Sequence, residues 1–138
     1  MSLSDCKLID FPTVCDSRGN LIFIEEKKHV PFEIKRVYYL CDVASGSKRG
    51  GHSHKEMRQI VIALSGSFNA VLDDGVKRKS VFLNNPHQGL YIPPGIWREL
   101  IDFSSNAVAL VLASTLYDES DYERDYDAYR KMKQSTAH

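Results

Sequence analysis

Residues 46–66 read GSKRGGHSHKEMRQIVIALSG, and their pattern is the strongest indication of the fold. It places His52 and His54 two positions apart, shortly before an apolar run at 60–64. Residues two apart on a β-strand point to the same face of the sheet. The pattern therefore predicts that the two imidazoles project together from one strand into the interior of a β-structure.

On either side of this stretch, short runs of strand-forming residues alternate with turn residues. The expected strands are 21–25, 34–43, 59–64, 68–72, 79–83, 89–92, 97–103 and 108–113. Gly66 and Gly75 lie in two of the turns between them, and Pro93-Pro94-Gly95 interrupts a third connection. Short strands at even spacing are typical of a sandwich or barrel. We expect an all-β fold of about eight to ten strands.

The end of the chain has a different period. Tyr122, Tyr126 and Tyr129 are spaced by four and three residues, which indicates a helix over about 119–133. Its tyrosine face is more often a docking surface than a ligand site. Neither a linker nor a repeat divides the 138 residues, so the sequence predicts one domain over 1–138 with its barrel at about 5–115.

The charge balance argues against several classes of partner. Eighteen Lys and Arg residues match eighteen Asp and Glu residues, so no basic face is expected for nucleic acid. No apolar run approaches the roughly 20 residues of a membrane-spanning helix. The N-terminus lacks the pattern of a secretory signal, and the three cysteines have no disulfide-like or zinc-like spacing. We expect a cytoplasmic protein with no membrane association.

The 46–66 stretch resembles the first cupin motif. Gly46, His52, His54 and Gly66 match its spacing, and only Gln59 departs, standing where the motif has an acid. Residues 87–98 resemble the second motif, with Arg98 at the position of a third histidine. The resemblance implies a cupin jelly-roll β-barrel with a short C-terminal helix.

The two departures change the expected chemistry. Arginine stays protonated and has no lone pair for a metal, and a catalytic metal usually requires three protein ligands. The sequence therefore predicts neither a metal nor another cofactor. Imidazoles without a metal can take and return protons near neutral pH.

Within the cupins, the chain is similar to the nucleotide-sugar 3,4-ketoisomerases, the WxcM-like sugar ketoisomerases. The likeness rests on 16–19, 35–39, 49–54, 72–75, 89–97 and 112–122. It implies conversion of TDP-4-keto-6-deoxyglucose to a TDP-3-keto-6-deoxyhexose through an enediol, in surface-polysaccharide sugar synthesis. It also implies a homodimer binding the TDP-linked keto sugar, with exchanged N-terminal strands as one form of that dimer.

The resemblance implies catalytic roles for three residues. His52 is the expected principal base and His54 its partner or a second proton carrier, although either order fits the sequence. Tyr38 is the expected hydroxyl assistant. Tyr39 is the alternative for the pocket, because neighbours on a strand face opposite sides.

A second group of residues is expected to bind the substrate. Arg18 and Arg49 suit a pyrophosphate, because guanidinium groups form paired hydrogen bonds with phosphate oxygens. Arg98 is a candidate for phosphate or sugar contact, with Gln59 as a further binding candidate. Trp97, the neighbour of Arg98, should face away from the pocket and pack.

Three other functions are alternatives for a cupin chain of this kind. A cupin nucleotide-sugar epimerase would also remove a proton beside a ketone, but such epimerases are longer chains. A metal-dependent dioxygenase conflicts with Gln59 and Arg98. A non-catalytic sugar-binding cupin would keep the pocket without turnover.

Overall fold

The structure is a computed structural model that describes residues 1–136, and most of the chain is β-strand. The strands are β1 (Lys7–Asp10), β2 (Thr13–Asp16), β3 (Gly19–Ile22), β4 (Arg36–Leu40), β5 (Arg49–His54), β6 (Gln59–Ser65), β7 (Phe68–Asp73), β8 (Arg78–Leu83), β9 (Gln88–Ile92), β10 (Trp97–Ile101), β11 (Val108–Ala113) and β12 (Tyr122–Glu123). The helices are η1 (Leu3–Asp5), η2 (Glu119–Asp121) and α1 (Tyr126–Thr136). Residues 137 and 138 of the predicted domain lie outside the described residues.

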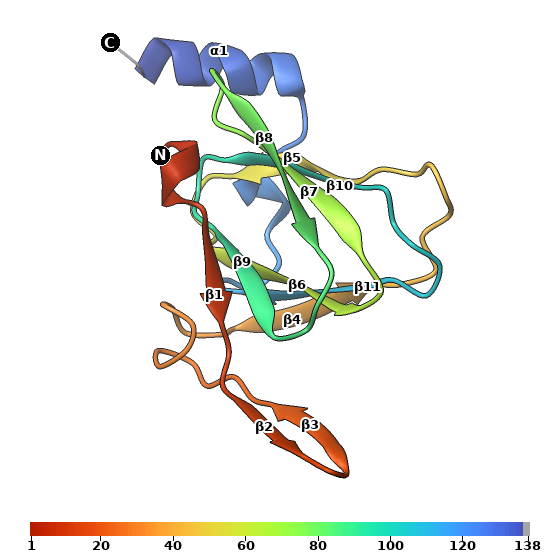
Figure 1. The fold of residues 1–138 in the computed structure, drawn as a ribbon. Coiled ribbons are helices and arrows are strands. Elements are labelled where there is room, and N and C mark those ends of the chain that lie inside the picture. The colour runs from red at the N-terminus through yellow and green to blue at the C-terminus, as the bar shows by residue number, and fades with distance from the viewer. Residues whose placement is uncertain (137–138) are drawn as a thin grey trace.

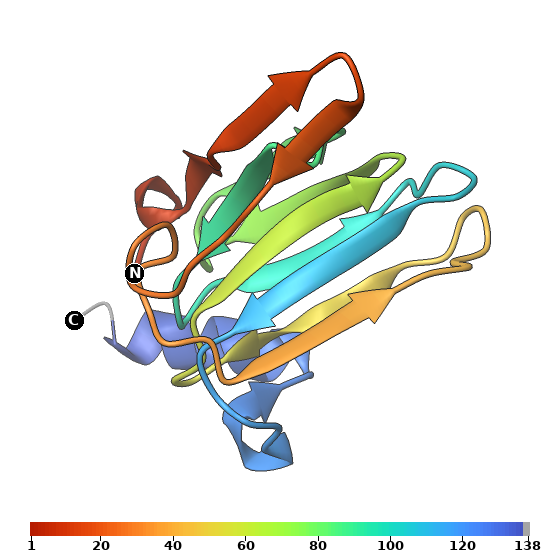
Figure 2. The ribbon, with the colours of Figure 1, turned by 90° about the horizontal axis from the view of Figure 1, so that it is seen from below.

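Two antiparallel five-stranded sheets face each other, as Figures 1 and 2 show. The first has the order β1-β9-β6-β11-β4 and the second β12-β5-β10-β7-β8. The all-β barrel with a C-terminal helix is thus confirmed. The expected strands beyond residue 55 lie close to those observed, whereas β1 and β2 were not predicted.

The side chains of β6 show how the sheets build the core. Val61 and Ala63 point between the two sheets, where they join a cluster that includes Phe68. Ile60 and Ile62 point to the outer face and pack in a second cluster that includes Phe32. This alternation follows from the two-residue period of a strand. It leaves the first sheet apolar on both faces.

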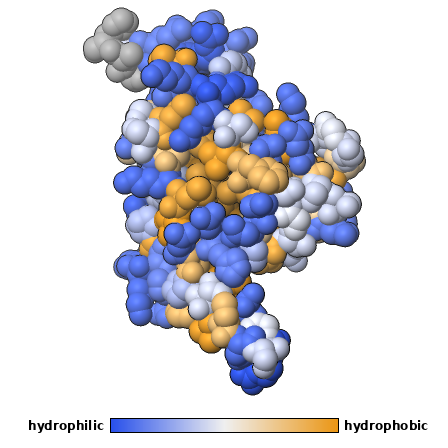
Figure 3. Space-filling view, viewed as in Figure 1, coloured by the Kyte–Doolittle hydropathy of each residue, from blue (hydrophilic) through white to orange (hydrophobic). Residues whose placement is uncertain are grey.

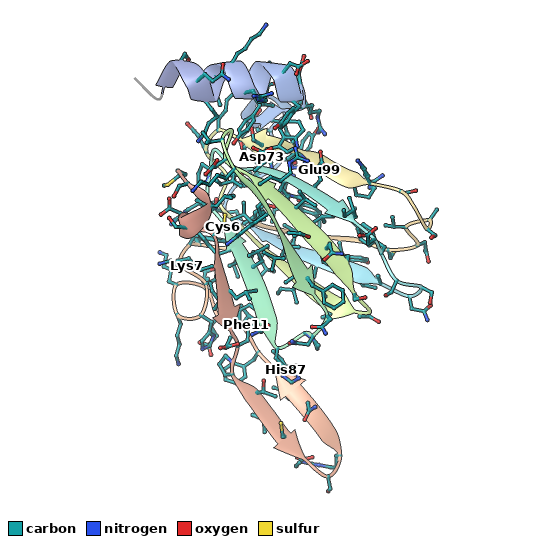
Figure 4. All side chains as sticks on the ribbon, turned by 45° about the horizontal axis from the view of Figure 1, so that its top comes forward. Cys6, Lys7, Phe11, Asp73, His87 and Glu99 are labelled. Atoms are coloured by element: carbon teal, nitrogen blue, oxygen red, sulfur yellow. The ribbon has the colours of Figure 1, made fainter. Side chains whose placement is uncertain are left out.

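The C-terminal helix begins at Tyr126 and not near 119 as predicted, because residues 119–123 form η2 and β12 instead. Trp97 packs against the α1 tyrosines, with its ring 5.2 Å from that of Tyr126 and 5.6 Å from that of Tyr129. Tyr126 also donates a 2.6 Å hydrogen bond to Asp73, at the end of β7 beneath the helix (Figure 4). The tyrosine face is therefore a docking surface, and Trp97 faces away from the barrel interior. Within residues 1–136, no helix has the length and apolar character to span a membrane.

The β2–β3 hairpin projects from the barrel at the end opposite α1 (Figure 1). It leaves the barrel after Phe11, whose amide donates a 2.8 Å hydrogen bond to the carbonyl of His87 at the base of the hairpin (Figure 4). Val14 and Leu21 remain 53% and 58% exposed on its strands. The tip is hydrophilic, as Figure 3 shows. A two-stranded hairpin alone is marginally stable in water, so this element needs a surface to pack on.

Candidate active site

The two histidines project from β5 into the space between the sheets. Their ring centroids are 4.7 Å apart and nearly perpendicular, and the residues are only 5% and 2% exposed. β5 pairs with β10 so that Arg98 lies directly opposite His52. Directly opposed residues share a face of the sheet, which brings the guanidinium to the imidazoles.

A pocket of about 310 Å³ opens beside His52, between β4 and β5. It is lined by Arg36, Tyr38, Leu40, Arg49, Gly50, His52, Arg98, Tyr117, Tyr122 and Arg124. A larger cavity of about 600 Å³ lies elsewhere, between β1 and the 27–31 loop. Because the larger cavity lacks both inward-facing histidines, the pocket beside His52 is the candidate active site.

Tyr38 reaches this pocket from β4, and its hydroxyl accepts a 2.9 Å hydrogen bond from Arg98 Nη2. Arg98 is 1% exposed, and its Nε and Nη1 atoms have no hydrogen-bond partner within residues 1–136. Gly50 makes room for this guanidinium, since a Cβ at that position would collide with Nη1. The pocket therefore holds a buried cation whose remaining donors are free for a ligand.

Further cationic side chains surround the mouth of the pocket. Arg49, a predicted binding residue, lines it, and so do Arg36 and Arg124, which the sequence analysis does not single out. Arg124 forms a 2.7 Å ion pair with Glu119 and lies over the ring of Tyr122. These guanidinium groups make the mouth suited to an anionic ligand.

His54 lies behind His52 and has a carboxylate partner. Its Nδ1 atom is 3.0 Å from Asp121 Oδ2, and its Nε2 atom has no partner within residues 1–136. Tyr122 packs against both imidazoles, with centroid distances of 4.8 Å to His52 and 4.4 Å to His54. The sequence analysis does not identify Asp121 and Tyr122 as site residues, because the tyrosine spacing predicts a helix over 119–133.

Burial keeps the His52 imidazole neutral. Desolvation, followed by the charge of Arg98, lowers the His52 pKa to about 2. Burial also lowers the pKa of His54, although the hydrogen bond that His54 donates to the Asp121 carboxylate opposes this shift. Both rings are therefore uncharged at neutral pH and can accept protons. An anionic ligand beside the arginines would favour the protonated form of His52.

Gln59 lies at the start of β6 on the inward face. It is 1% exposed, and its Oε1 atom has no partner among the described residues. It does not line the pocket that contains His52. The glutamine therefore belongs to the barrel interior.

Like Gln59, two further predicted binding residues do not line the pocket. Tyr39 is 65% exposed, because it alternates with Tyr38 on β4 and the register turns Tyr38 inward. Arg18 lies at the tip of the β2–β3 hairpin, where its side chain is 89% exposed and pairs with Asp16 at 2.8 Å. Tyr39 is therefore corrected to an outward residue, and Arg18 does not line the pocket of its own chain.

The side chains around the two histidines do not form the ligand set of a metal centre. Within residues 1–136, no three histidine, cysteine or carboxylate side chains gather as a metal would require. Arg98 places a positive charge near the histidines, which opposes the binding of a cation there.

Fold and site together define a cupin whose buried histidine pair faces an arginine-lined pocket. The barrel resembles that of RmlC epimerase from Mycobacterium tuberculosis with a TM-score of 0.76, at 18% identity over 89% of this chain and 70% of that chain. This match supports the cupin fold alone. Residues 4–134 match the family model FdtA: WxcM-like, C-terminal. The chain belongs to this family.

Relatives of known activity are similar over nearly the whole length. A TDP-4-oxo-6-deoxy-alpha-D-glucose-3,4-oxoisomerase from Aneurinibacillus thermoaerophilus is 48% identical over 91% of this chain and 90% of its own. QdtA, a sugar 3,4-ketoisomerase from Thermoanaerobacterium thermosaccharolyticum solved with TDP, is 44% identical with a TM-score of 0.94, covering 98% of each chain. A 3,4-ketoisomerase from Helicobacter canadensis is 46% identical with a TM-score of 0.92, over 94% of this chain and 98% of that one.

Proposed function

We propose that this protein is a nucleotide-sugar 3,4-ketoisomerase that converts TDP-4-keto-6-deoxyglucose to a TDP-3-keto-6-deoxyhexose. The observation that carries the proposal is the buried His52 imidazole, with both ring nitrogens unpartnered, at a pocket that also presents the Tyr38 hydroxyl. Relatives support the substrate, since a histidine-to-asparagine variant of QdtA was solved in complex with TDP-4-keto-6-deoxyglucose.

The geometry supports a two-step proton transfer. His52 removes the proton from carbon three, next to the ketone, while the Tyr38 hydroxyl protonates the oxygen on carbon four. The resulting enediol has hydroxyls on both carbons. His52 then returns its proton to carbon four, and Tyr38 recovers one from the carbon-three hydroxyl, which leaves the ketone at carbon three.

The cationic mouth supports recognition of the nucleotide diphosphate. Arg49 and Arg36 line the pocket near Arg98, and guanidinium groups suit paired contacts to phosphate oxygens. Arg36 is held by contacts to Met57 Sδ at 3.2 Å and the Tyr122 hydroxyl at 3.4 Å. A fixed guanidinium loses less side-chain freedom when it binds phosphate.

The proposed form of the protein is a homodimer that exchanges its N-terminal hairpins. β4 ends its sheet and forms one wall of the pocket, and an edge strand is a template for an added strand. A hairpin from a second copy placed along β4 would cover Val14 and Leu21. It would also bring Arg18 of the partner subunit to the mouth of the pocket.

Incubation with TDP-4-keto-6-deoxyglucose, labelled with ¹³C at carbon four, tests the function. A ketoisomerase moves the ketone signal from carbon four to carbon three in the NMR spectrum. An epimerase inverts a carbon and leaves the ketone in place, and a binding cupin gives no product. Either of the last two results would reject the proposal.

Co-expression of Arg18→Ala and His52→Asn chains tests the hairpin exchange. In a mixed dimer with exchanged hairpins, one site carries both changes and the other carries neither. With random pairing about half of the dimers are mixed, and each of these has one intact site of its two. The mixture therefore has roughly a quarter of the wild-type activity. Activity no higher than that of the two variants alone would contradict the contribution of Arg18 across the dimer.

A further inference from the structure

The carboxylate of Asp121 is fixed against β5 by the backbone. Its Oδ1 atom accepts a 2.7 Å hydrogen bond from the Glu56 amide, and its Oδ2 atom accepts one of 3.3 Å from the Met57 amide. The Lys55 amide also donates to the Asp121 carbonyl at 2.9 Å. The side chain is 12% exposed. These contacts set the carboxylate in one place before any ligand binds.

The same carboxylate determines which ring nitrogen of His54 carries the proton. An ionised carboxylate only accepts hydrogen bonds, so the 3.0 Å contact requires the hydrogen to be on Nδ1. In the neutral ring, Nε2 then keeps a lone pair. That nitrogen is buried without a partner among residues 1–136. His52 has no comparable orienting partner, since both of its nitrogens are unpartnered there.

The residue after Asp121 fixes the ring plane as well. Tyr122 pairs with His54 across the β12–β5 ladder, and its ring lies 4.4 Å from the His54 imidazole. The 121–122 segment therefore restricts both the tautomer and the orientation of His54.

We propose that Asp121 is a positioning residue of the reaction, which holds His54 as the Nδ1–H tautomer so that the unprotonated Nε2 serves the histidine pair as a proton acceptor. Asp121 acts through His54 and contacts no substrate. The inference rests on the proposed isomerase activity for its kinetic consequence, but the tautomer is a property of the free protein.

Asp121→Asn is the sharpest test, because the asparagine Oδ1 can still accept the Glu56 amide. Its side-chain amide donates, so it reverses the hydrogen bond and moves the ring hydrogen of His54 to Nε2. Two-bond ¹H–¹⁵N NMR distinguishes the two tautomers, and the His54 signal is assigned by its loss in His54→Gln. We expect kcat to fall by about 10²–10⁴-fold with KM changed little.

Asp118→Asn is the matched control. Asp118 lies in the same segment, and its carboxylate accepts hydrogen bonds from Ser120 while being exposed. This variant should keep the wild-type tautomer and kcat. Asp121→Glu, which retains a carboxylate acceptor for Nδ1–H, should keep the wild-type tautomer and recover part of the activity lost in Asp121→Asn.

Three results would overturn the proposal. One is an Nε2–H tautomer of His54 in the wild-type protein, a measurement that needs no substrate and no change at Asp121. Another is a reversed tautomer in Asp121→Asn with kcat within twofold of wild type. The third is an equal loss of kcat in Asp118→Asn. An inactive wild-type protein with His54 in the Nδ1–H form would instead reject the proposed function and keep the tautomer assignment.

Discussion

Arg98 donates to the Tyr38 hydroxyl oxygen across the pocket, from β10 to β4, at 2.9 Å. Because the guanidinium has no acceptor, the phenol oxygen receives this bond and its own hydrogen stays free to point elsewhere. The pair therefore joins the two sheets at the site and leaves Tyr38 able to donate a proton.

Tyr38→Phe should lower kcat by about 10²–10⁴-fold, the usual contribution of a positioned acid or base. The change removes the hydroxyl and keeps the ring that packs against the core. Tyr39→Phe on the outer face of the same strand is the matched control and should leave kcat unchanged. Steady-state kinetics with TDP-4-keto-6-deoxyglucose would check both, and similar rates for Tyr38→Phe and wild type would remove Tyr38 from the mechanism.

Arg98→Met should make the protein more stable and less active. The Arg98 side chain is buried with two unpartnered nitrogen atoms, so an apolar side chain removes the cost of keeping this charge away from water. We expect a gain of about 1–4 kcal/mol, the range seen when apolar residues replace buried ion pairs. Urea unfolding measures the gain in the free energy of unfolding, and steady-state kinetics measure the loss of activity. Arg49→Met, at an exposed arginine of the same pocket, should change the free energy of unfolding by much less. A destabilised Arg98→Met protein would contradict the interpretation.

Gly50→Ala should damage the site, whereas Gly51→Ala should be tolerated. Gly50 has φ +70°, which favours glycine, and an added Cβ there would collide with Arg98 Nη1. At Gly51 the nearest atoms to an added Cβ are 3.8 Å away, an ordinary contact. We expect Gly50→Ala to cost roughly 1–2 kcal/mol from the backbone alone and to lower kcat by displacing Arg98. Urea unfolding and steady-state kinetics compare the two variants. Equal free energies of unfolding and equal kcat values would contradict this role of Gly50.

The sequence predicted those parts of the site that depend on local periodicity. His52 and His54 face one way because they are two apart on a strand, and Trp97 faces away from Arg98 because the two are adjacent. The choice between Tyr38 and Tyr39 required the register of β4 against β11, which is a long-range pairing.

The remaining parts of the site depend on contacts between distant segments. Asp121 meets His54 from 67 residues away, because a short strand replaces the first turns of the expected helix. Arg124 lines the pocket for the same reason, because it directly follows this short strand. The placement of Arg18 depends on the direction in which the hairpin leaves the barrel, and periodicity carries no information about that direction.

Acid should destabilise the protein through its histidine pair before its carboxylates titrate. In the unfolded chain these histidines bind protons below about pH 6.5. In the folded protein burial lowers the His52 pKa to about 2 and also lowers that of His54. The unfolded state therefore binds more protons as pH falls through 6.5, and the stability present at pH 7 is progressively lost.

The expected loss is about 2 kcal/mol per histidine between pH 7 and pH 5. Urea unfolding at pH 7, 6 and 5 measures it, and His52→Asn serves as the comparison. Because asparagine does not titrate, the variant should lose about 2 kcal/mol less than wild type over the same interval, whatever its stability at pH 7. Parallel curves for the two proteins would mean that His52 binds its proton as readily in the folded barrel as in the unfolded chain.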